Sequence, residues 1–99
     1  MFKSAKELKK ETDEVFNEAL EKEIKRLVEV FTSKTAQAKR DGEYEIFLTI
    51  DTHSDLELIA MKIIRKKLKE KGYKCGFIRL RERWSYDYYE MKVSWKKIK

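Results

Sequence analysis

The chain has 99 residues, of which 42% are charged and 41% hydrophobic, and its formal net charge is +6. This length fits one domain with a single core, and so much apolar material excludes a disordered chain. No stretch approaches the roughly 18 to 20 apolar residues of a membrane span, and no apolar secretory run follows the first residues, so we expect a cytoplasmic protein that does not contact membranes.

The first predicted element is a long helix from Ser4 to Arg40. Ser4 and Glu7 have the spacing of a capping box, in which each side chain accepts a hydrogen bond from the other residue's backbone N–H. Gly42 supplies the left-handed residue that commonly ends a helix. Between these ends, apolar residues recur at steps of three and four, as on one helix face, at Leu8, Val15, Phe16, Ala19, Leu20, Leu27, Val28 and Phe31.

This helix is too long for the domain that carries it. At 1.5 Å per residue it would measure about 55 Å, whereas a compact chain of this size has a radius of gyration of about 13 Å. Either the helix breaks near Thr32 and Ser33 and folds back, or its N-terminal half packs against a second subunit. We expect the second arrangement, a homodimer whose interface contains Leu8, Val15, Phe16 and Leu20.

The rest of the chain predicts a strand, a helix and a hairpin. Residues 44–50 alternate in polarity, as a strand with one buried face does. Ser54 and Glu57 form a second capping box, and the helix that follows ends at Gly72. Residues 73–81 and 86–95 predict two antiparallel strands joined by a short connection. The apolar stripe of the second helix is expected at Leu56, Ile59, Ala60, Ile63, Ile64 and Leu68.

The predicted fold is therefore α+β, with the order α-β-α-β-β and one domain over residues 1–99. The helix at 1–41 precedes a β-α-β-β core at 43–99. A right-handed crossover through the second helix leaves room for the third strand between the other two, which gives a three-stranded antiparallel sheet. Residues expected to face the helices are Ile46, Leu48, Ile50, Ile78, Leu80, Met91, Val93 and Trp95. Those expected on the opposite face are Phe47, Phe77, Arg79, Arg81, Tyr88 and Lys92.

Charge is divided unevenly along the chain. Residues 1–61 contain 10 Lys or Arg and 14 Asp or Glu, whereas residues 62–99 contain 14 and 4, so a segment of net charge −4 precedes one of +10. Cations displace counterions from phosphates, and aromatic rings stack on bases. The outer sheet face therefore predicts a nucleic-acid site composed of Arg79, Arg81, Arg83, Lys92, Phe77 and Tyr88.

A simpler explanation of this face needs no ligand. Arg79 and Arg81 can pair with Glu45 and Glu90 across the sheet, while the rings are covered by the long helix or a partner. The second helix offers a further basic surface, at Arg65, Lys66 and Lys69, that could clamp phosphates. Solvation and the helix dipole explain the lysines at the end of this helix without any ligand, at Lys66, Lys67, Lys69 and Lys71.

Residues for catalysis or for a cofactor are sparse. His53 lies between Asp51 and Asp55 where a strand meets a helix, but the chain has no second His and no plausible Cys partner, so a capped turn is expected there instead of a metal site. Cys75 fits a small buried apolar residue. No phosphate loop, nucleophile elbow or catalytic triad spacing is present, so we expect neither an enzyme nor a cofactor.

The pattern from Gly72, Tyr73, Lys74 and Cys75 to the strand 89–95, after a Lys- and Glu-rich opening helix, resembles small accessory proteins of bacteriophages and large DNA viruses. The resemblance implies a virus-encoded binding protein that works in the host cytoplasm, and it carries over no functional residue. We therefore expect a non-enzymatic accessory protein that binds nucleic acid or a nucleoprotein.

Two other classes of function remain open. The first is an inhibitor or assembly factor that binds a host or phage protein through the long helix or the open sheet face, with the basic charge steering the encounter. The second is a dimer that holds an anionic small molecule between its subunits.

Overall fold

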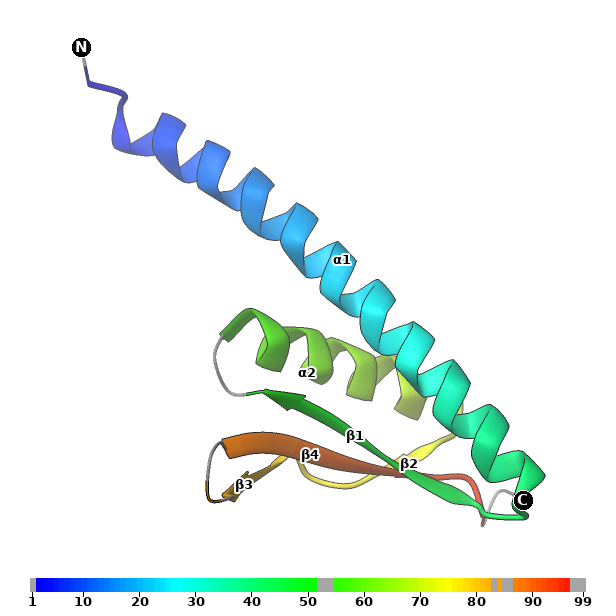
Figure 1. The fold of residues 1–99 in the computed structure, drawn as a ribbon. Helices are drawn as coiled ribbons and strands as arrows, with labels where there is room; N and C mark the ends of the chain where they lie inside the picture. The colour runs from blue at the N-terminus through cyan, green and yellow to red at the C-terminus, as the bar shows by residue number, and fades with distance from the viewer. Residues whose placement is uncertain (1, 52–54, 83, 85–86, 97–99) are drawn as a thin grey trace.

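A computed structural model describes residues 2–51, 55–82, 84 and 87–96. Two helices lie on one face of an antiparallel sheet, and the longer helix crosses above the shorter one (Figure 1). The α+β fold and the order of its elements are as predicted. The elements are α1 (Ala5–Arg40), β1 (Glu45–Asp51), α2 (Asp55–Glu70), β2 (Lys74–Cys75), β3 (Arg79–Glu82) and β4 (Asp87–Ser94).

Helix α1 has the ends that the sequence predicts. Ser4 Oγ accepts a hydrogen bond from the backbone N–H of Glu7 at 3.1 Å. At the other end Gly42 has φ 72°, and the N–H groups of Glu43 and Gly42 donate to the carbonyls of Ala38 and Lys39, which is the Schellman arrangement. Helix α2 ends in the same way at Gly72, with φ 96°. The predicted cap at Ser54 lies outside the described residues.

Helix α1 does not break at Thr32 and Ser33. It continues through them, and its N-terminal half projects beyond the rest of the molecule (Figure 1). The molecule is correspondingly elongated, with extents of 62 × 36 × 20 Å and a radius of gyration of 16.7 Å. Residues 5–18 are exposed, whereas Leu27 and Ala38 nearer the C-terminus are buried.

Strand β4 lies between β1 on one side and β2 and β3 on the other, as the crossover argument predicts. The predicted strand at 73–81 is wrong in one respect, because it is interrupted and forms β2 and β3. Four residue steps separate Cys75 from Arg79, but only three separate their partners Val93 and Glu90. The segment from β2 to β3 therefore has one extra residue opposite β4, which is a β-bulge. The bulge lets Cys75 point to the core while Arg79, also odd-numbered, points away from it.

The core lies between the sheet and the helices. Predicted inward residues Ile46, Leu48, Ile50, Met91 and Val93 are buried. Leu80 also lies on the predicted inner face, in one row with Tyr89 and the buried Ile50. It is nevertheless 50% exposed, because α2 packs on β1 and β2 and not on β3. Met61 is buried although the predicted stripe omits it, because α1 lies across α2 and buries a second side of that helix.

Both edges of the sheet are covered by cations from the helices. Lys34 Nζ of α1 donates to the carbonyl of Phe47 on β1. On the other side, Arg65 Nε of α2 donates to the carbonyl of Gly76 at 2.9 Å. Unpaired edge carbonyls invite strand addition, and a charged side chain over the edge is a common protection against it.

Candidate nucleic-acid interface

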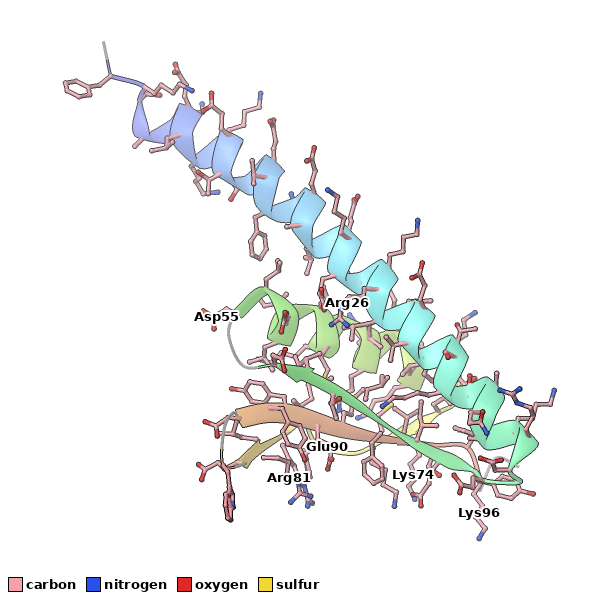
Figure 2. All side chains as sticks on the ribbon, in the orientation of Figure 1. Arg26, Asp55, Lys74, Arg81, Glu90 and Lys96 are labelled. Carbon is pink, nitrogen blue, oxygen red and sulfur yellow. The ribbon has the colours of Figure 1, made fainter. Side chains whose placement is uncertain are left out.

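The outer face of the sheet is turned away from both helices. Strand register aligns its side chains in rows: Phe47 is beside Lys92, Glu90 lies between Thr49 and Arg79, and Tyr88 lies between Asp51 and Arg81. Figure 2 shows Arg81 and Lys96 extending from this side of the sheet. The predicted residues Phe77, Arg79, Arg81 and Lys92 are all exposed, and Tyr88 is half-buried between its neighbours.

Two adjoining hollows mark this face. The first has a volume of about 310 Å³ and is lined by Phe47, Gly76, Phe77, Arg79, Arg81, Glu90 and Lys92. The second, of about 500 Å³, is lined by Glu45, Lys74, Cys75, Gly76, Lys92, Ser94 and Lys96. Gly76 and Lys92 belong to both linings, so the two hollows adjoin along β4. We call this surface the sheet groove.

The sheet groove is basic, but part of its charge is paired. Its lining contains five cations (Lys74, Arg79, Arg81, Lys92 and Lys96) and two carboxylates (Glu45 and Glu90), a net charge of +3. Arg81 Nε lies 3.3 Å from Glu90 Oε1, and Lys92 Nζ lies 2.8 Å from Glu45 Oε2. Exposed pairs of this kind are worth about 0 to 1 kcal/mol, so a phosphate can compete with them.

The ligand-free explanation of this face is therefore partly confirmed. It predicts the pair of Arg81 with Glu90, but Glu45 pairs with Lys92 instead of with an arginine. It also predicts that the long helix or a partner covers the rings. In the chain itself, Phe77 is 77% and Phe47 44% exposed, and α1 covers neither of them.

Arg65 joins this surface from the helix layer. Its guanidinium carbon lies 6.0 Å from the centroid of the Phe77 ring, while its Nε is bound to the Gly76 carbonyl. Arg65 therefore holds the edge of the sheet and supports the ring, which is a positioning role. Lys66 and Lys69 are exposed on α2, in the helix layer, and lie apart from the sheet groove. The predicted site residue Arg83 lies outside the described residues.

Lys74 and Lys96 are groove residues that the predicted site omits. Uninterrupted alternation from Arg79 back along the strand would turn Lys74 toward the helices. The bulge reverses that direction and aligns Lys74 with Ser94 on the outer face. Gly76 inside the strand pattern is the signal that could have indicated this bulge.

In the described part of the chain, no group of three His, Cys, Asp or Glu is placed to hold a metal ion, and His53 lies outside this part. Burial raises the pKa of the Cys75 thiol, an effect that nearby Arg65 and Lys69 oppose. Among the described helices, none is long and apolar enough to cross a membrane.

No family model, curated protein or solved structure matches this chain. The resemblance to accessory proteins of bacteriophages and large DNA viruses stays a prediction.

Proposed function

We propose that the chain binds nucleic acid in the sheet groove, as a non-enzymatic binding protein. The observation that carries this proposal is the uncovered outer face, where the exposed rings of Phe47 and Phe77 border a groove of net charge +3. Backbone phosphates would lie against the cations, and counterion release would supply much of the affinity. An origin in a phage or DNA virus is proposed on the resemblance alone.

Unpaired strands fit this surface better than a duplex does. Sheets that bind single strands stack unpaired bases on exposed rings and guide the backbone with cations. The hollow beside Phe47 and Phe77 has about 310 Å³, enough for a base with its ring against either phenylalanine. A duplex keeps its bases stacked internally and would leave both rings without a partner.

Binding of a fluorescent single-stranded DNA oligonucleotide, followed by anisotropy at 50 to 300 mM salt, tests the proposal. With three to four phosphates neutralised, the slope of log K against log salt should be on the order of −2 to −3. The double variant Arg79→Ala, Arg81→Ala removes two groove cations and should weaken binding about tenfold or more, in every sequence tested.

The matched control is Lys22→Ala, Lys25→Ala, which removes the same charge from exposed positions of α1. This control should lose much less affinity than the groove variant. Absence of binding at 50 mM salt would refute the proposal, and equal losses in the two variants would show that only the net charge matters.

A further inference from the structure

The apolar stripe of α1 changes direction halfway along the helix. In the C-terminal half, Leu20, Ile24, Leu27 and Phe31 pack against the chain's own core. Counting back from Leu20 by four and then three reaches Phe16 and Asp13. Four more positions reach Lys9, whose Nζ lies 2.7 Å from Asp13 Oδ2, and this hydrogen bond raises the pKa of Lys9. The face that continues the core stripe is therefore ionic beyond Phe16.

A second stripe lies one sequence position before the face that continues the core stripe. It consists of Ala5, Leu8, Thr12, Val15 and Ala19, at steps of three and four. One residue corresponds to a rotation of about 100° around a helix, so this stripe points about 100° away from the core stripe. Leu8 is 56% and Val15 68% exposed. The Thr12 hydroxyl donates to the Leu8 carbonyl at 2.7 Å, so its polar group is satisfied within the helix.

Steps of three and four are typical of the contact residues of a coiled coil. The contact residues of the second helix pack between those of the first. We propose that the second stripe is an interface with a second copy of this chain, packed antiparallel. We call this stripe the dimer seam. It shares Leu8 and Val15 with the interface predicted from the sequence, while Phe16 lies on its flank and Leu20 belongs to the core stripe.

The charges of the projecting helix indicate both the partner and its direction. Residues 2–10 contain four Lys and one Glu, a net charge of +3, whereas residues 11–21 contain five Asp or Glu and no Lys or Arg, a net charge of −5. An antiparallel pair places the basic segment of each copy beside the acidic segment of the other. A parallel pair would align like charges instead.

A register centred near residue 10 satisfies the seam. It places Ala5 beside Val15 of the second copy and Leu8 beside Thr12 of the second copy, so a larger residue meets a smaller one in each layer. It also brings the exposed Phe2 toward Phe16 of the second copy.

Like charges meet near the centre of this register, but each is already paired within its own chain. Lys9 approaches Lys9 of the second copy, and Asp13 neutralises each of them. Glu11 approaches Glu11 of the second copy, and Lys3 Nζ lies 2.6 Å from Glu11 Oε2. An interface this short favours reversible association, with a dissociation constant on the order of micromolar.

Sedimentation velocity of the full chain at about 5 to 500 μM tests the association, with no nucleic acid present. The wild type should shift from monomer to dimer over this range. Leu8→Glu with Val15→Glu should remain monomeric with an unchanged circular dichroism spectrum, since both side chains are exposed in the single chain. Val28→Glu, at an α1 position that is 46% exposed outside the seam, is the matched control and should still dimerise. A wild type that stays monomeric would overturn the proposal.

Disulfide trapping tests the direction. In a Cys75→Ala background, the double variant Ala5→Cys, Val15→Cys should form a covalent dimer on mild oxidation. Ala5→Cys alone should not, because the antiparallel register places position 5 of one copy ten positions away from position 5 of the other, about 15 Å along the helices. A covalent dimer from Ala5→Cys alone would show parallel packing and would refute the antiparallel register.

Discussion

At the scale of single residues, the bulge between β2 and β3 decides which side chains form the sheet groove. Gly76 still follows the register of β2, since its N–H donates to the Lys92 carbonyl at 2.9 Å, so the extra residue lies at 77–78. The shift lets Cys75 enter the core while Lys74 and Arg79 both join the outer face. Side-chain alternation can be read from a sequence, but the residue at which a bulge resets it depends on pairing with β4, which is a long-range contact.

The buried thiol of Cys75 makes a prediction about pH. Burial raises its pKa above the ordinary value of 9.0, so the folded chain retains the proton where the unfolded chain loses it. The contribution of the buried, protonated thiol to the free energy of unfolding is therefore complete below pH 9. It declines as the pH rises toward the folded-state pKa.

Urea unfolding of the wild type and Cys75→Ala between pH 7 and 10.5 measures this effect. The wild type should be more stable by about 1 kcal/mol at pH 7, and this difference should shrink above pH 9. Taking the difference between the two proteins cancels the titration of the lysines and tyrosines. A difference that stays constant across the range would contradict the assignment.

At the scale of elements, the helix ends were predictable because their signals are local. Ser4, Gly42 and Gly72 act through hydrogen bonds within a few residues of themselves. The interruption of the strand at 76–78 and the exposure of Leu80 were not predictable in this way. The interruption depends on pairing with β4, and the exposure of Leu80 depends on which strands α2 covers. The periodicity of one segment contains neither.

Gly72 gives the element-scale prediction. Its φ of 96° lies in the left-handed region, and an added Cβ would meet no atom within 4 Å, so Gly72→Ala should cost about 1 kcal/mol through backbone strain alone. Gly76→Ala is the control, because its φ lies outside that region and its Cβ would lie 3.8 Å from Lys92, an ordinary contact. Chemical unfolding should show the loss for Gly72→Ala only, and equal stability of the two variants would contradict this account.

At the scale of the whole molecule, the two proposed interfaces lie on separate parts of the chain. Residues 5–19 of α1 contain the proposed dimer seam, while the sheet groove lies on the outer face of the sheet, on the side away from both helices. The uneven charge along the sequence predicts a basic surface, but it does not predict which cations share it. Arg79, Arg81 and Lys92 share it through strand pairing, whereas Lys66 and Lys69 lie on α2, in the helix layer.

An antiparallel dimer would hold two sheet grooves at opposite ends of a paired rod. One nucleic-acid strand long enough to reach both would then bind more tightly than two short ones, through the effective concentration of the second site. Tighter binding of a long strand requires both the sheet groove and the antiparallel dimer. The experiments above test these two proposals separately.

Amide NMR of the labelled chain, titrated with a single-stranded oligonucleotide at low salt, shows where the strand binds. The largest shifts should fall on the sheet groove, at Gly76, Phe77, Arg79, Arg81 and Lys92. Shifts confined to α1 and the exposed side of α2, around Lys66 and Lys69, or no shifts at all, would contradict binding in the sheet groove.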